Sequence, residues 1–194
     1  MAPLAPPVPK SPSHETLDQY VGKNITQICQ FGFGKVGDTA NHCAHFVGHA
    51  LALSFGTTCR NMFSLPNLKK AGLIHESGAS IRVNELYNAL TDTEYRDDFS
   101  EADIGLIFVT VTGNYDRKNN RIGEFTKKHV GIIKNGNVWH YGNANDRVRC
   151  DSIKTFISIF VSAYGQGERK NIVLCFAKMP LTNVGMPVEE GIWI

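Results

Sequence analysis

Residues 128–143 read KHVGIIKNGNVWHYGN, and this stretch decides how the second half of the chain folds. Asn135 and Gly136 at its centre are the strongest short-range signal for a two-residue hairpin turn, because both central residues of that turn need a positive φ. Apolar and β-branched residues flank the turn on both sides. The pattern therefore predicts two antiparallel strands, residues 128–134 and residues 137–143.

The register of this hairpin brings two histidines close together. A two-residue turn pairs Gly131 with His140 and His129 with Gly142, and paired residues share one face of a sheet. His129 and His140 are then diagonal neighbours, within reach of two imidazole rings. The glycines opposite them leave room for the rings and for a substrate, while Asn143 falls on the other face if the strand stays regular.

The rest of the second half adds strands and one helix to this hairpin. Residues 104–112 read IGLIFVTVT, a nearly continuous apolar and β-branched run that predicts a buried strand. Residues 113–127 are polar and are expected to form a loop. Residues 151–164 predict a helix, and residues 171–178 predict the last strand.

Helical segments precede these strands. Apolar residues recur at helical spacing over residues 15–29, 41–55 and 80–90, although Gly22 weakens the first of the three predictions. Glycines over residues 31–38 predict a loop between the first two helices. Helices that come first, followed by strands that are neighbours in the sequence, indicate an α+β fold.

The length and composition of the chain predict a single globular domain. The chain has 194 residues, of which 42% are hydrophobic and 20% charged, and its net charge of +2 is too small to indicate nucleic-acid binding. Residues 1–13 are proline-rich and predict a disordered tail, which leaves residues 14–194 as the domain. We expect a chain made in the cytoplasm, because it shows neither a signal peptide nor a membrane-spanning run. Export by a non-Sec route stays open.

The spacing of the cysteines and histidines bears on metal binding. Five cysteines at irregular spacing, without a CxxC pair, argue against a structural zinc site and fit a reduced compartment. Cys29 and Cys175 are expected to be small buried residues. His42, His45 and His49 form one helical stripe, which is either a metal-binding face or a polar flank. The flank is favoured because the glutamate of an HExxH motif is missing, so no metal and no cofactor is expected.

Cys43 is the candidate nucleophile. It lies in the first turn of the predicted helix 41–55, whether Thr39 or Asn41 caps that helix. The positive end of the helix dipole and the free backbone N–H groups favour a thiolate at this position. Cys43 also shares the face of Phe46 and its apolar neighbours, so its sulfur should point toward the sheet on which the helix packs.

These positions predict a catalytic triad. Cys43 would be the nucleophile, His129 would accept its proton, and His140 would orient His129. Backbone N–H groups at the start of the helix would form the oxyanion hole. The alternative interpretation is that Cys43 is a buried, inert thiol and that the histidines are ordinary polar residues of a strand.

The same residues resemble a known family. The segment HCAHFV at 42–47, followed by HVGII at 129–133 and then by His140, is similar to the NlpC/P60 family of papain-like cell-wall peptidases. The resemblance implies a papain-like fold in which the nucleophile helix packs on an antiparallel sheet. In the related CHAP amidases the triad tends to end with a carboxylate or an amide, and Asn143 would then replace His140.

The resemblance also implies a reaction. It indicates a cysteine peptidase or amidase that cleaves amide bonds in peptidoglycan stem peptides through an acyl-enzyme, without a cofactor. Positions that shape the substrate pocket of the family fall on His42, Phe33 and Gly131. The segment between Cys43 and His129 is longer than is usual in the family. We expect the surplus, residues 56–103, to be an insertion.

Other functions are compatible with the same scaffold. An acyltransferase or thioesterase would use the same acyl-enzyme with water excluded, and a binding module would keep the scaffold without the chemistry. The expected partner is a peptidoglycan peptide, joined by an immunity or inhibitor protein if the chain is an effector. Nucleic acid is not expected as a partner, and no membrane span is expected.

Overall fold

The structure is a computed structural model, and it describes residues 12–29, 41–53, 82–179 and 181. Several predictions lie outside these residues. They are most of the proline-rich tail, the glycine loop with Phe33, the cap at Thr39, and residues 56–81 of the expected insertion.

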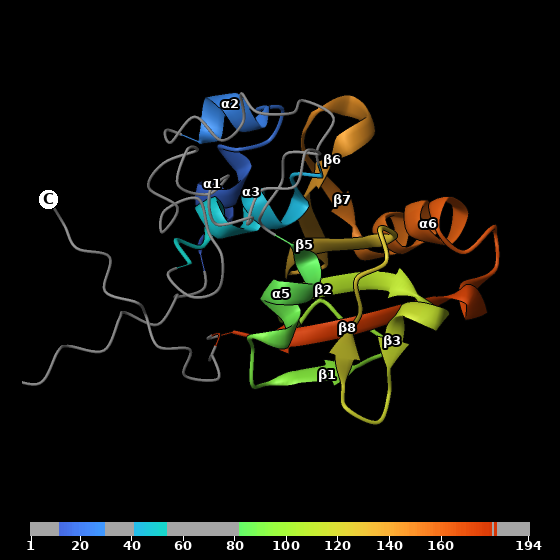
Figure 1. The fold of residues 1–194 in the computed structure, drawn as a ribbon. Helices are drawn as coiled ribbons and strands as arrows, with labels where there is room; N and C mark the ends of the chain where they lie inside the picture. The colour runs from blue at the N-terminus through green and yellow to red at the C-terminus, as the bar shows by residue number, and fades with distance from the viewer. Residues whose placement is uncertain (1–11, 30–40, 54–81, 180, 182–194) are drawn as a thin grey trace, which may run out of the picture.

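A six-stranded antiparallel sheet forms the centre of the molecule (Figure 1). Its strand order is β1-β8-β2-β5-β6-β7, so β8, the last of the described strands along the chain, lies between β1 and β2. The bounds are β1 Thr93–Tyr95, β2 Ile104–Val111, β5 Lys128–Lys134, β6 Asn137–Gly142, β7 Arg147–Ser152 and β8 Ile172–Lys178. The sheet confirms an α+β fold, and its interior strands β2 and β8 lie where the sequence predicted strands.

The hairpin of β5 and β6 has the predicted turn. Asn135 and Gly136 have φ values of 49° and 78°, the left-handed conformations that the sequence pair favours. Gly131 lies opposite His140, as predicted, but within the described strands the ladder ends at this pair. His129 therefore lies just beyond the last pair, where β5 and β6 begin to separate.

Helices cover both faces of the sheet. The first face carries α1 His14–Asp18, α2 Ile25–Ile28, α3 Cys43–Ala50 and α5 Val83–Asn88, and the second face carries α6 Ile153–Ala163. Alternation along the strands supplies each face with its own core. Phe108 and Val130 point to the first face, whereas Val109 and Ile133 point to the second.

The first predicted helix is wrong in its extent, because it is two short helices. Gly22 has a φ of +83°, a conformation that a regular helix cannot contain, and it separates α1 from α2. A capping box begins α2. The Asn24 side chain accepts from the Gln27 backbone N–H, and the Gln27 side chain accepts from the Asn24 backbone N–H.

The predicted loop 113–127 is also more regular than expected. It contains the end of the 3₁₀ turn Thr112–Asn114 and a small two-stranded sheet, β3 Tyr115–Asp116 with β4 Arg121–Ile122. The Asn114 side chain organises this segment, because its Oδ1 accepts the Phe125 N–H at 3.0 Å. Two further 3₁₀ turns, Asn143–Asn145 and Arg169–Asn171, precede β7 and β8.

Part of the expected insertion belongs to the main body of the fold. Its described residues, 82–103, supply α5 to the core of the first face and β1 to the edge of the sheet. The helices predicted over 41–55 and 80–90 are present as the shorter α3 and α5. Across the described part of the chain, no helix has the length and apolar character needed to cross a membrane.

Candidate active site

Cys43 is the first residue of α3 and is buried, with 1% of its surface exposed. The N-cap of α3 is His42, whose side chain makes no cap hydrogen bond, so the prediction of Asn41 as the cap is wrong. Asn41 precedes the N-cap, and its Oδ1 accepts the Cys43 backbone N–H at 3.1 Å. The backbone N–H of His42 donates to Oδ1 of Asn143 at 3.2 Å. These two bonds fix the start of α3 beside the end of β6, and α3 packs on β5 and β6.

The surroundings of the thiol favour its protonated form. Burial raises the pKa of Cys43 to about 12, although the backbone N–H groups of Val130, Ala44 and Cys43 itself and the charge of Lys128 act in the opposite direction. The expected stabilisation of a thiolate at the helix start is therefore present but smaller than the cost of desolvation. In this conformation the thiol needs a base before it can react.

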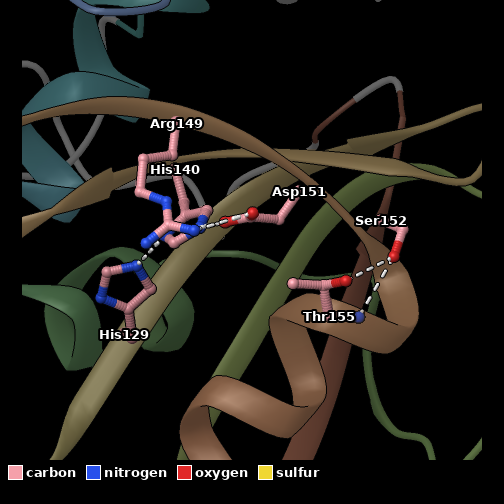
Figure 2. A network of polar contacts seen from close by, with 6 residues as sticks. All are labelled: His129, His140, Arg149, Asp151, Ser152 and Thr155. Carbon is pink, nitrogen blue, oxygen red and sulfur yellow. Dashed lines mark hydrogen bonds and ion pairs between the residues drawn. The ribbon is translucent and has the colours of Figure 1, made fainter.

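His129 and His140 form a buried pair on the second face (Figure 2). His129 Nε2 lies 3.0 Å from His140 Nδ1, and each residue is 2% exposed. The Phe160 ring lies 4.5 Å from the His129 ring between centroids, and the Phe156 ring lies 4.9 Å from the His140 ring. The aromatic side chains of α6 thus shield the pair from water.

Asp151 extends this pair, and the sequence analysis missed it. Its Oδ2 lies 2.9 Å from His140 Nε2, and its Oδ1 accepts from the Arg149 guanidinium at 2.9 Å (Figure 2). Asp151 is carried by β7, a strand that was not predicted. The alternating polar and apolar residues of 147–152 (RVRCDS) were the available signal for this strand.

The hydrogen bonds determine where the protons lie. Burial acts to raise the pKa of Asp151, but the hydrogen bonds and charges of His140 and Arg149 outweigh it, so the net pKa is lowered and the carboxylate is ionised. An ionised carboxylate only accepts, so His140 Nε2 carries the proton. His140 Nδ1 then accepts from His129 Nε2, which leaves His129 Nδ1 with a lone pair.

His129 is neutral in this arrangement. Its pKa lies well below the ordinary value because of burial and of the nearby His140, and burial also lowers the pKa of His140. The unprotonated nitrogen of His129 points away from His140 (Figure 2). The arrangement of Asp151, His140 and His129 therefore presents a neutral imidazole with one unprotonated nitrogen and an oriented ring.

Cys43 and His129 belong to different faces of the sheet. Cys43 lies in the core of the first face with Val130, whereas His129 precedes Val130 and points to the second face, against Phe160. Among the residues that the structure describes, no hydrogen bond joins the Cys43 sulfur to His129 or His140. The predicted pairing of nucleophile and base is therefore not formed in this conformation.

The two faces nevertheless meet at the start of β5. The Lys128 carbonyl accepts from Asn41 Nδ2 at 3.5 Å and from the Tyr164 hydroxyl at 3.3 Å. Burial raises the pKa of Tyr164, and the charge of a Cys43 thiolate would raise it further. The start of α3 and the end of α6 thus converge on the residue before His129. Neither Lys128 nor Tyr164 was identified from the sequence.

The remaining predicted site residues lie in packed surroundings. A Cβ on Gly131 would lie 2.6 Å from Val138 Cγ1 and 3.1 Å from the His140 Cβ, so the room predicted for a substrate is already filled. His42 is buried, and its ring stacks edge-on against Tyr141 at 5.6 Å between centroids. Asn143 binds the start of α3, and His140 is the residue that contacts His129.

Comparison of this chain with models of protein families, with curated proteins and with solved structures finds no match. Function must therefore be inferred from the geometry of the side chains. Two features define the candidate site, namely a cysteine at a helix start and a buried Asp151–His140–His129 array on the neighbouring strands.

Proposed function

We propose that this protein is a cysteine hydrolase that cleaves amide bonds through a thiol acyl-enzyme. Cys43 is the nucleophile, His129 is the general base, and His140 with Asp151 orients that base. The observation that carries the proposal is the array of 3.0 Å and 2.9 Å contacts, which leaves His129 Nδ1 as a basic nitrogen. Such an array of base and orienting groups is the arrangement that activates a nucleophile in hydrolases.

The reaction would require a rearrangement where the start of α3 meets the start of β5, because Cys43 and His129 lie on opposite faces of the sheet and rotation of the Cys43 side chain alone does not join them. In the rearranged conformation the thiol proton passes to His129 Nδ1. The imidazolium that forms is stabilised through His140 by the Asp151 carboxylate. The thiolate then attacks the substrate carbonyl, the C–N bond breaks, and the leaving amine takes the proton from His129. Water, deprotonated by His129, hydrolyses the thioester.

The substrate class follows from the resemblance to NlpC/P60 peptidases. We propose peptide stems of peptidoglycan as the substrate, and an immunity or inhibitor protein as a further partner if the chain acts as an effector. Mass spectrometry of purified peptidoglycan, digested with wild type and with Cys43→Ala, tests this assignment. New peptide ends that appear with wild type alone support it, and identical digests contradict it.

The pH dependence of Cys43 alkylation tests the pairing directly. We expect the iodoacetamide rate, followed at Cys43 by peptide mass spectrometry, to rise at a pH well below the pKa of about 12 that the thiol has in the described conformation. His129→Gln should move that rise to higher pH, because it removes the base. Cys150, which is exposed on β7, is the internal control whose rate should not change. Identical Cys43 profiles in both proteins would exclude the base role.

A non-catalytic binding module is the second candidate. It is favoured by the buried Cys43 thiol with its raised pKa and by the placement of Cys43 and His129 on opposite faces. On this proposal Cys43 reacts only near its raised pKa, in wild type and His129→Gln alike. The alkylation profile therefore separates the two candidates without requiring a substrate.

A further inference from the structure

A second cluster of reactive side chains lies where α2 meets α3. It consists of Cys29, His45 and His49, whose potential ligand atoms all lie within 4.8 Å of one another. The Nε2 atoms of His45 and His49 are 3.2 Å apart. The cluster belongs to the first face of the sheet, whereas the Asp151–His140–His129 array lies on the second face.

Local structure positions each member of the cluster. His45 and His49 are four residues apart on α3, so their side chains lie one above the other on one face of the helix. Cys29 is the C-cap of α2, and its backbone N–H donates to the Ile25 carbonyl at 2.8 Å. Tyr141 holds the other end of α2, because its hydroxyl accepts the Ile25 N–H at 3.0 Å. The thiol is therefore presented by an anchored backbone.

Burial of the cluster suits metal ligands better than a solvated flank. Cys29 and His45 are buried and His49 is partly exposed, so the predicted polar flank is not what these residues form. Burial lowers the pKa of His45, while its hydrogen bond with Cys29 acts against that shift. A neutral imidazole is the form that binds a metal ion.

The separation of the two imidazole nitrogens matches a tetrahedral metal. Two imidazole nitrogens that bind zinc at about 2.0–2.1 Å lie roughly 3.3 Å from each other in tetrahedral geometry, close to the 3.2 Å between the His45 and His49 nitrogens. One thiolate and two imidazoles form a donor set that favours zinc and similar borderline-soft cations. We propose that Cys29 Sγ, His45 Nε2 and His49 Nε2 bind one Zn²⁺ ion and thereby join α2 to α3.

His42 would orient the central ligand. Its Nδ1 lies 3.4 Å from His45 Nδ1. When His45 binds the metal through Nε2, its Nδ1 carries the proton and donates a hydrogen bond to His42 Nδ1. Metal-binding histidines commonly donate their second ring N–H to an outer partner in this way. The histidine stripe of α3 thus has two roles, with His45 and His49 as ligands and His42 as the residue that fixes the ring of His45.

Zinc titration of the full chain tests the proposal. After removal of metal by a chelator, the wild type should take up about one equivalent of Zn²⁺ in competition with a chromophoric chelator. Cys29→Ser and His49→Gln should each weaken binding at least roughly tenfold, since each removes one of three ligands. Cys150→Ser and His129→Gln are matched controls elsewhere in the chain, and both should bind zinc as the wild type does.

Two measurements on the wild type keep the test independent of folding in the variants. Co²⁺ should produce a thiolate-to-cobalt charge-transfer band, and Zn²⁺ should slow alkylation of Cys29, followed by peptide mass spectrometry, more than that of Cys150. Absence of zinc uptake by the wild type overturns the proposal. It is equally overturned if Co²⁺ binds without the thiolate band or if Cys29→Ser retains full affinity, because a hydrogen-bonded histidine pair then accounts for the 3.2 Å contact.

Discussion

Asp151 determines the protonation of two buried histidines from a position that contacts only one of them. Its carboxylate accepts from His140 at 2.9 Å and from Arg149 at 2.9 Å. Because His140 Nε2 donates to Asp151, His140 Nδ1 accepts from His129 Nε2, and His129 Nδ1 is left unprotonated. In the proposed mechanism the same carboxylate balances the charge that His129 acquires, so the effect of Asp151 is largest when the imidazolium forms.

Replacement of Asp151 by asparagine tests this positioning role. Asp151→Asn keeps the shape of the side chain but removes the charge, and we expect hydrolysis to fall by about 10²-fold, within the range of general-base contributions. The Cys43 alkylation profile should also move to higher pH. Arg149→Gln is the matched control, because it removes the other partner of the carboxylate and leaves the bond to His140. An Asp151→Asn variant with the wild-type pH profile would contradict the role.

At the scale of the elements, close packing of the β5–β6 hairpin holds the two histidines in place. Gly131 lies opposite His140, and a Cβ at this position would overlap Val138. We expect Gly131→Ala to lower the free energy of unfolding by about 1–3 kcal/mol, the usual cost of overpacking. Gly48→Ala in α3 is the control, since a Cβ there meets nothing within 4 Å; it should stabilise by roughly 0.5–1 kcal/mol. Urea denaturation measures both, and equal stability of Gly131→Ala and wild type would contradict the packing argument.

The hairpin was predictable because its information is local. Asn135-Gly136 specifies the turn, the turn specifies the register, and the register places His129 near His140. Asp151 and Cys29 were missed for different reasons. Asp151 reaches His140 across the pairing of β6 with β7, which the alternation of residues 147–152 signals. Cys29 reaches its histidine only through the packing of α2 on α3, and no short-range pattern encodes that contact.

The choice of face was the hardest feature to predict. Alternation along β5 correctly separates His129 from Val130, but it does not say which helix covers which side. Both α3 and α6 have an apolar face that fits a sheet. In the structure α3 covers Val130 and α6 covers His129, so the expectation that Cys43 and His129 face each other depended on a tertiary choice that periodicity leaves open.

For the whole molecule, buried neutral histidines couple folding to pH. Burial lowers the pKa values of His45, His129 and His140 in the folded chain, whereas in the unfolded chain each returns to about 6.5. Below that pH the unfolded state binds more protons, so stability falls as the pH falls. The lowered pKa of Asp151 acts at lower pH, because its contribution is lost only as the pH drops below about 4.

We therefore expect the free energy of unfolding to decrease as the pH falls below about 6.5, the pKa of histidine in the unfolded chain. Each histidine that stays neutral contributes up to about 1.4 kcal/mol per pH unit, and urea denaturation at several pH values measures the combined slope. His129→Gln should reduce that slope by up to the contribution of one histidine, about 1.4 kcal/mol per pH unit, because glutamine does not titrate. This expectation holds whatever the variant does to stability at neutral pH. A slope that is unchanged in this variant would mean that His129 is protonated in the folded chain, and a protonated His129 has no lone pair with which to accept the Cys43 proton.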